Sequence, residues 1–218
     1  EYRRLLVSFW RFAARAFRPS LTRRGLPEVQ QANELLVGDL SLIYEIKEVC
    51  GHHPFPFPHD YVGPMEWSRW EDIGEKPPWS SNPRERTVYI NAGTFPLNHG
   101  LLHGIKEQLQ TRHVRLLISS GLNGMNETGA RMFCRPFLSP RKAVQLADLV
   151  ICSGGVGSCY NNLRYGAPSL VLPRHPEQAT NGLNLERIGC GRTLIRNTPF
   201  QGDAARYEQG RIIRLAEE

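Results

Sequence analysis

The chain has 218 residues, of which 40% are hydrophobic and 22% are charged, a balance typical of folded globular proteins and not of disordered ones. Its formal net charge is +6, and residues 1–26 account for all of it with seven arginines and one acidic residue. The other residues balance 20 basic against 20 acidic ones, so the sequence predicts no basic surface for a nucleic acid. Because the chain begins at Glu1 without a methionine, we expect a fragment or a processed chain.

The first segment places arginines among apolar residues at helical spacing, which predicts an amphipathic helix. Residues 3–18 would contact either a neighbouring domain or the surface of an anionic membrane. The apolar run is too short to span a bilayer, and it lacks the apolar core and cleavage site of a signal peptide. We therefore expect a cytoplasmic protein, with peripheral membrane association through this helix as the alternative.

Residues 25–60 contain a polar helical stretch, an apolar run of strand length from Leu40 to Ile46, and a proline-rich segment from Gly51 to Asp60. The last segment carries three histidines, but prolines hold it extended and the spacing fits no common set of zinc ligands. We expect a surface loop there and no metal. The five cysteines are irregularly spaced, which predicts free thiols that act as small apolar residues, Cys134 and Cys152 among them.

From Thr87 onward, short apolar runs alternate with helical patterns. We expect strands at 87–91, 114–119, 132–137, 149–152, 169–172 and near 192–195, with helices at 99–110, at 140–147, after the turn at 153–158, at 177–188 and at 204–218. This alternation predicts an α/β fold, a Rossmann-like parallel sheet with helices on both faces.

A glycine-rich turn, Ser153 to Ser158, follows the strand at 149–152 and opens a helix. Glycines let backbone N–H groups approach a ligand, and the helix N-terminus adds a partial positive charge, so the turn suits a phosphate. A tight strand-to-helix turn without a ligand explains these glycines equally well.

The loop after the next strand adds Glu177, Gln178 and Asn181 at the start of another helix. A carboxylate and two amides offer the acceptors and donors that sugar hydroxyl groups need. An acidic residue in the first turn of a helix is by itself common, so the indication comes from the two loops together.

In this combination, the glycine turn, Gly166-Ala167-Pro168, the strand ending in Pro173 and the Glu177-Gln178 pair resemble the C-terminal, donor-binding half of GT-B glycosyltransferases. The superfamily is that of the UDP-glucosyl and UDP-glucuronosyltransferases, especially its bacterial macrolide and antibiotic branch. The likeness spans roughly residues 61–194. Residues 1–64 resemble a remnant of the N-terminal acceptor-side domain, 65–86 an interdomain linker, and 87–218 the nucleotide-sugar domain.

The resemblance implies three groups of site residues. The donor diphosphate would contact Gly93, Thr94, Ser153, Gly154, Gly155, Gly157 and Ser158. The nucleoside would contact Phe137, Leu138 and Asn161, and the donor sugar Glu177, Gln178 and Asn181. Two positions depart from the family pattern: Ser153 stands where a histidine usually touches the diphosphate, and Asn161 stands where plant-type members have a glutamate for the ribose.

The implied reaction is transfer of a sugar from a UDP- or dTDP-linked donor to a hydroxyl group of a small-molecule or lipid acceptor. It proceeds with inversion and needs no catalytic metal or cofactor. The family's general base is a histidine of the N-terminal half, which is mostly absent, so no catalytic residue is assigned. One alternative is a non-catalytic nucleotide-sugar-binding subunit that is active only with a separate acceptor-binding partner. Another, a GT-B epimerase, would require acid and base residues between the domains that the sequence does not show.

Overall fold

The structure is a computed structural model that describes residues 2–51, 55–65, 85–93, 99–110, 114–121 and 124–194, together with residues 75, 77 and 79. The chain divides into two compact units, residues 1–63 and 64–218, each with its own elements. Within the described residues, no helix combines the length and the apolar character needed to cross a membrane.

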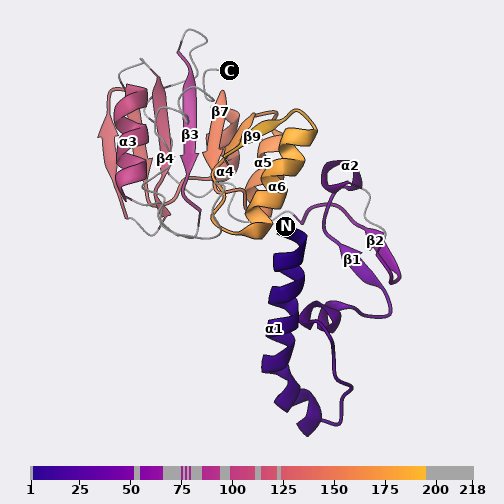
Figure 1. Cartoon of the computed structure of the whole chain (residues 1–218). Coiled ribbons are helices and arrows are strands. Elements are labelled where there is room, and N and C mark those ends of the chain that lie inside the picture. The colour runs from indigo at the N-terminus through magenta and orange to yellow at the C-terminus, as the bar shows by residue number, and fades with distance from the viewer. Residues whose placement is uncertain are drawn as a thin grey trace. The chain divides into compact units, whose positions relative to one another are not determined.

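The first unit contains a long helix and a small parallel sheet (Figure 1). Its elements are α1 (Tyr2–Arg23), η1 (Ala32–Leu36), β1 (Ser41–Ile43), α2 (Lys47–Cys50) and β2 (His59–Tyr61). The predicted N-terminal helix is confirmed by α1, on which Phe12 is 71% exposed and Ala14 is buried. Strand β2 differs from the predicted surface loop, because residues 59–61 pair in parallel with β1.

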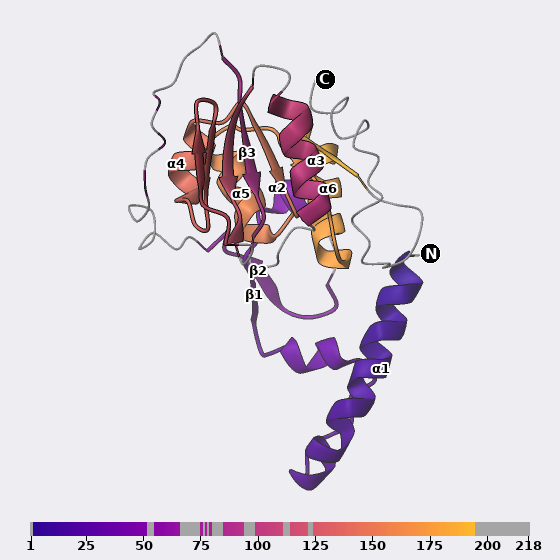
Figure 2. The ribbon, with the colours of Figure 1, turned by 90° about the vertical axis from the view of Figure 1, so that its left-hand side faces the viewer.

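The second unit is built on one sheet with the strand order β5-β6-β4-β3-β7-β8-β9. All neighbouring strands are parallel except β5 and β6. The strands are β3 (Thr87–Asn91), β4 (Arg115–Ser119), β5 (Glu127–Gly129), β6 (Met132–Arg135), β7 (Leu149–Cys152), β8 (Ser169–Val171) and β9 (Gly191–Thr193). The helices are α3 (His99–Gln110), α4 (Pro140–Gln145), α5 (Val156–Arg164) and α6 (Pro176–Arg187). Figure 2 shows the same arrangement from the side. The mostly parallel sheet and its helices confirm the predicted α/β fold.

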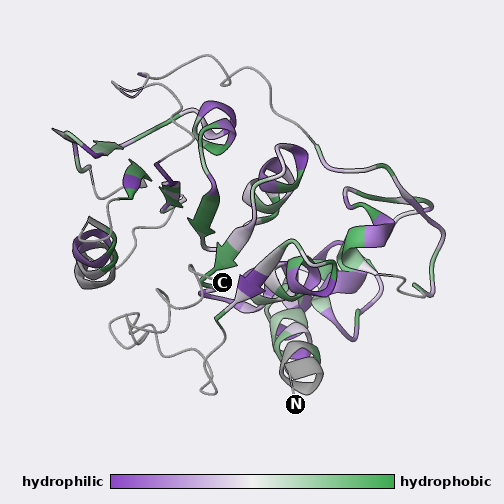
Figure 3. Cartoon of the chain, turned by 90° about the horizontal axis from the view of Figure 1, so that it is seen from above, coloured by the Kyte–Doolittle hydropathy of each residue, from purple (hydrophilic) through white to green (hydrophobic). Residues whose placement is uncertain are grey.

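In the five strands between the two edge strands of the sheet, β6, β4, β3, β7 and β8, successive apolar residues enter two different hydrophobic clusters, one on each face of the sheet. Ile90 of β3 packs in the cluster that contains Ile105 of α3, whereas Tyr89 packs in the cluster that contains Val144 of α4 and Leu185 of α6. The strands are therefore apolar on both sides, as parallel strands covered by helices are, and they are mostly green in Figure 3.

Several elements differ from the expected ones. Strand β5 lies between the expected strands at 114–119 and 132–137, where no strand was expected, and it forms a hairpin with β6. The expected strand at 132–137 ends at Arg135, because Pro136 has no N–H to continue the ladder. Strand β9 covers residues 191–193 and not 192–195, and the expected helix at 204–218 lies outside the described residues.

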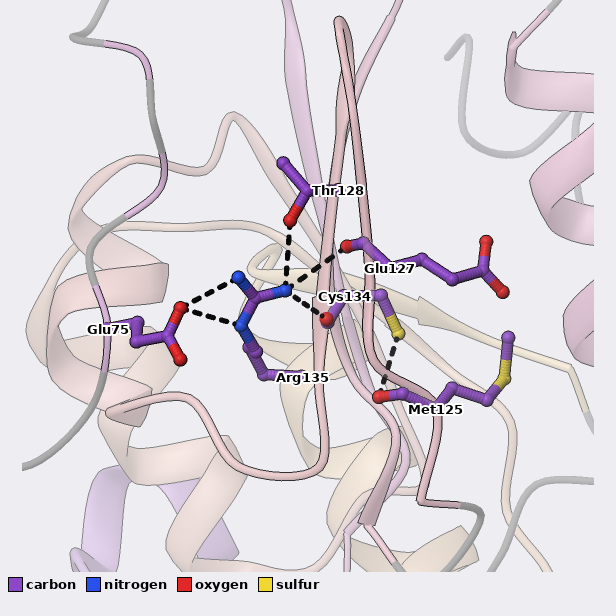
Figure 4. Close-up of polar contacts among 6 residues, drawn as sticks. All are labelled: Glu75, Met125, Glu127, Thr128, Cys134 and Arg135. Carbon is purple, nitrogen blue, oxygen red and sulfur yellow. Dashed lines mark hydrogen bonds and ion pairs between the residues drawn. The ribbon is translucent and has the colours of Figure 1, made fainter.

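The hairpin edge of the sheet is tied to the predicted linker by Arg135 (Figure 4). Its Nε and one terminal nitrogen donate to the Glu75 carboxylate at 2.8 and 2.7 Å, and the other terminal nitrogen donates to the Cys134 carbonyl at 2.8 Å. The guanidinium lies 4.0 Å from the centre of the Phe133 ring. The hydrogen bond from Arg135 lowers the pKa of Glu75, so this carboxylate remains ionised at neutral pH.

Close packing of α6 on the sheet depends on Gly182. A Cβ atom there would lie 2.7 Å from Thr193 Oγ1 and 2.9 Å from Val171 Cγ1. We expect Gly182→Ala to lower the free energy of unfolding by about 1–2 kcal/mol, because the overlap outweighs alanine's better helix propensity. Gly157→Ala, at a helical position with no atom within 4 Å, is the matched control and should leave stability unchanged or raise it slightly. Urea denaturation of both variants measures the effect, and equal stabilities would contradict this account of the α6 packing.

Candidate functional site

The order of the parallel strands places a ligand crevice between β3 and β7. The six parallel strands are, in chain order, β3, β4, β6, β7, β8 and β9. If they are numbered 1 to 6 in that order, they lie side by side in the sheet as 3-2-1-4-5-6. The order therefore reverses direction between β3 and β7. In open α/β sheets, ligands bind outside the carboxyl ends of the strands at this reversal. The residues there are Asn91 to Gly93 after β3 and Ser153 to Gly155 after β7, and the Cβ position of Gly93 lies 3.7 Å from Ser153 Oγ.

The first glycine of the turn after β7 is required by the fold. Gly154 has φ of +88°, and a Cβ atom would meet Val171 Cγ1 at 2.6 Å and the Gln178 carbonyl oxygen at 2.7 Å. Both the backbone conformation and the space exclude any other residue. The turn is therefore pressed against β8 and the first turn of α6.

The next two glycines differ from Gly154. Gly155 is the N-cap residue of α5 with φ of −60°, and Gly157 lies in the first turn. Among the described residues, no atom beyond the chain neighbours and the helix's own backbone lies within 4 Å of the Cβ position of either glycine. No side chain caps α5, so the N–H groups of its first turn, with their partial positive charge, have no side-chain partner from the N-cap residue.

Two serines border this turn. Ser158 Oγ accepts a hydrogen bond from Asn91 Nδ2 at 3.3 Å, and Ser153 Oγ accepts one from Gln178 Nε2 at 3.4 Å. A hydroxyl that accepts these bonds still has its own proton to donate. Thr94, which the resemblance also assigned to the diphosphate, lies outside the described residues.

The predicted sugar-binding residues lie at the start of α6 and have different environments. Glu177 is 55% exposed, and one of its oxygens accepts from Asn181 Nδ2 at 2.6 Å. The same nitrogen donates to the Gly154 carbonyl at 2.9 Å, so Asn181 joins α6 to the glycine turn. Gln178 is buried, and its side-chain oxygen accepts from the Arg174 N–H at 2.9 Å. The structure thus uses Gln178 to hold two loops together, while the Glu177 carboxylate faces outward.

The predicted nucleoside-binding residues also differ in how far their side chains are exposed. Phe137, between β6 and α4, is 45% exposed, whereas Leu138 is buried in the core on the α4 face. Any contact of Leu138 with a nucleoside would come from its backbone. Asn161, on α5, has a buried side-chain nitrogen without a hydrogen-bond partner among the described residues.

Two polar residues that support the site were not expected from the sequence. Asn162 is buried and donates to Ser169 Oγ at 3.0 Å, which fixes α5 to β8. It also contacts Cys152, and a hydrogen bond from Cys159 lowers the pKa of the Cys152 thiol. Asn91 joins the β3 loop to α5. For Asn91, the available signal was a polar residue at the end of an apolar strand, but this does not reveal the partner. Asn162, inside α5, carried no such signal.

Among the described residues, no three His, Cys, Asp or Glu side chains come close enough together to hold a metal ion. His52 and His53 lie outside those residues, and the ring of His59 hydrogen-bonds with the carbonyl of Phe57 at 3.0 Å.

Known proteins resemble this chain in sequence and in fold. A glycosyltransferase of PGL/p-HBAD biosynthesis from Mycobacterium tuberculosis is 31% identical over 179 residues, which are 79% of this chain and 40% of the relative. A PGL/p-HBAD rhamnosyltransferase from Mycobacterium bovis is 28% identical over 73% of this chain and 35% of the relative. The chain thus spans less than half the length of these relatives. No family model matches it.

Solved structures show the same fold at low identity. The glycosyltransferase of kitacinnamycin superposes with a TM-score of 0.73 at 16% identity, over 94% of this chain and 52% of that one. A spinosyn rhamnosyltransferase complexed with thymidine diphosphate superposes with a TM-score of 0.61 at 18% identity, over 91% and 51%. Sequence and fold agree: the chain resembles glycosyltransferases in sequence and has the fold of the GT-B enzymes.

Proposed function

We propose that this chain forms the donor site of a glycosyltransferase and binds a UDP- or dTDP-linked sugar at the carboxyl ends of β3, β7 and β8. The complete enzyme would transfer the sugar to a hydroxyl group of a small-molecule or lipid acceptor, with inversion at the anomeric carbon. The general base and most acceptor contacts would come from the N-terminal half found in longer relatives.

One observation carries this proposal: Gly155 and Gly157 are glycines that the fold does not need. Neither has a positive φ, and within the part of the chain that the structure describes no atom from another element would obstruct a Cβ atom at either position. A glycine in such a place is explained by a ligand that must approach the backbone closely. This supports a ligand at the turn over a tight turn alone, because only Gly154 is required by the packing.

The chemistry follows from the groups around this space. Negative charge develops on the diphosphate as the bond to the sugar breaks, and fixed N–H groups, the α5 dipole and the Ser158 hydroxyl would stabilise it. Ser153 contributes a hydroxyl and no charge. The Glu177 carboxylate would accept hydrogen bonds from sugar hydroxyls and so orient the anomeric carbon toward the acceptor. No metal or cofactor enters this scheme.

The choice between the two nucleotides is guided by the spinosyn enzyme, whose structure holds thymidine diphosphate. We therefore place dTDP first and UDP second. The names of the mycobacterial relatives support rhamnose as the first sugar to test.

Bulk at Gly155 should abolish nucleotide binding without unfolding the protein. Gly155→Val places a side chain in the open space before α5, where a phosphate would lie. We expect at least a 100-fold loss of dTDP or UDP affinity by isothermal titration calorimetry, with an unchanged melting temperature. Gly129→Ala, in the β5–β6 hairpin, is the control and should bind like wild type. Tight binding to Gly155→Val would show that the phosphates lie elsewhere.

Glu177 should distinguish a nucleotide sugar from a bare nucleotide. Glu177→Gln keeps an oxygen for Asn181 but loses the charged acceptor. We expect affinity for the nucleotide sugar to fall about 10-fold while that for the nucleotide diphosphate stays the same, because only the sugar loses a charge-assisted hydrogen bond. Titration of both ligands into both proteins gives the comparison. Equal losses for the two ligands would assign Glu177 to the shape of the loop and not to the sugar.

A further inference from the structure

Asn91 is the last residue of the central strand β3, at the point where the strand order reverses. In the sheet register it lies between Ser119 of β4 and Cys152 of β7. Its side chain points to the same face of the sheet as that of Tyr89, two residues earlier, and this is the face that α5 covers. Neither the glycine motif nor the Glu177-Gln178 pair includes Asn91.

The carboxamide of Asn91 joins the two turns to which the proposed function assigns the diphosphate. Its oxygen accepts from the Gly93 N–H at 3.0 Å, and its nitrogen donates to Ser158 Oγ at 3.3 Å. Gly93 belongs to the loop after β3, and Ser158 belongs to the first turn of α5. One planar group therefore sets the separation between the two sides of the crevice.

The orientation of this amide is fixed by its partners. The Gly93 N–H can only donate, so the amide oxygen must face it, and the amide nitrogen must then face Ser158. Gly93 has φ of +67°, and its carbonyl oxygen occupies the place that a Cβ atom of Gly121 would take, so the loops after β3 and β4 approach each other closely.

A fixed donor at Asn91 has a consequence for Ser158. The Ser158 oxygen already accepts a hydrogen bond from Asn91, and the amide nitrogen offers no lone pair to receive the serine proton in return. The hydroxyl proton is thus available for an acceptor on the open side of the turn. A phosphate oxygen is such an acceptor, and a hydrogen bond to a charged oxygen is a strong one.

We propose that Asn91 is a positioning residue for the donor diphosphate: its amide orients the Ser158 hydroxyl as a donor and fixes the β3 loop against α5. The inference rests on the proposed function, since it names what prepares that site. Asn91 acts on the ligand through Ser158 and Gly93, without touching it.

Replacement of the amide by a carboxylate tests the orientation directly. Asn91→Asp preserves the shape and the acceptor for Gly93 but presents a second acceptor to Ser158. The serine proton would turn toward the carboxylate and away from the phosphate. Asn91→Ala removes both contacts, and Ser158→Ala removes the hydroxyl itself.

The experiment is a double-mutant cycle on nucleotide binding, with dTDP and UDP titrated calorimetrically into wild type, the three single variants and the double variant Asn91→Ala/Ser158→Ala. We expect each alanine substitution to weaken binding about 10-fold, and Asn91→Asp to weaken it more than Asn91→Ala. The double variant should lose clearly less than the product of the two single losses, because both act through one hydroxyl. Asn184→Ala, in the last turn of α6, is the matched control and should bind like wild type.

The outcomes separate this inference from the proposed function. If wild type binds no nucleotide, both fail. If wild type binds and Asn91→Ala binds equally well, or if the two single losses multiply in the double variant, only the role of Asn91 fails. Melting temperatures of all variants distinguish a loss of binding from a loss of fold, and Asn91→Asp, which retains the bond from Gly93, provides the folded test if Asn91→Ala does not fold.

Discussion

The rest of the site depends on the close approach of two backbone segments, the turn after β7 at Gly154 and the first turn of α6 at Gln178. Gly154 brings the turn so close to β8 and α6 that even a methyl group would overlap Val171 and the Gln178 carbonyl. Because the chain passes at this distance, the Gly154 carbonyl can reach Asn181 and the Ser153 hydroxyl can reach Gln178. The glycine turn, Ser153 to Ser158, and the start of α6 consequently pack directly on each other, and the order of strands brings the loop after β3 to the same end of the sheet.

The polar side chains around this turn have two different roles. Gln178 and Asn162 are buried, and the hydrogen bonds of their amides join loops, helices and strands to one another. Glu177 accepts from Asn181 with one oxygen and has its other oxygen 3.7 Å from His175 Nδ1, but its side chain is 55% exposed. Ser158 accepts from Asn91 and keeps its own proton to donate. An internal amide of fixed orientation is a suitable support for a ligand-facing hydroxyl, since it decides where the hydroxyl proton can go.

Much of the fold could be predicted from the sequence because its strands are covered on both faces. Apolar runs such as 149–152 and the punctuation by glycine and proline identify buried strands directly. The short strands β2 and β5 were missed, because three residues are too few to show the alternation of apolar and polar residues that marks a strand. Their formation depends on pairing with β1 and β6. For the same reason the ends of β6 and β9 were misplaced by about two residues.

The candidate site was predictable in place but less so in detail. The glycine turn and the residues after β8 do meet at one edge of the sheet, as the βαβ pattern requires. Sequence alone could not tell Gly154, which the packing requires, from Gly155, which it does not, nor the buried Gln178 from the exposed Glu177. These distinctions depend on tertiary distances. Asn91 was missed because it is a single asparagine at the end of a strand and belongs to no motif of residues at fixed spacing.

The ion pair between Arg135 and Glu75 also shows that the packing of the second unit includes residues upstream of β3. A segment twelve residues before β3 is attached to the hairpin at the sheet edge, and the Trp79 ring packs on Phe133 of the same strand. The sheet therefore includes, as part of its own packing, residues that resemble a linker in sequence. A chimera that joins this sheet to the first half of another glycosyltransferase would need its junction upstream of Glu75; a junction placed just before Thr87 would discard the side chains that cover the outer strands.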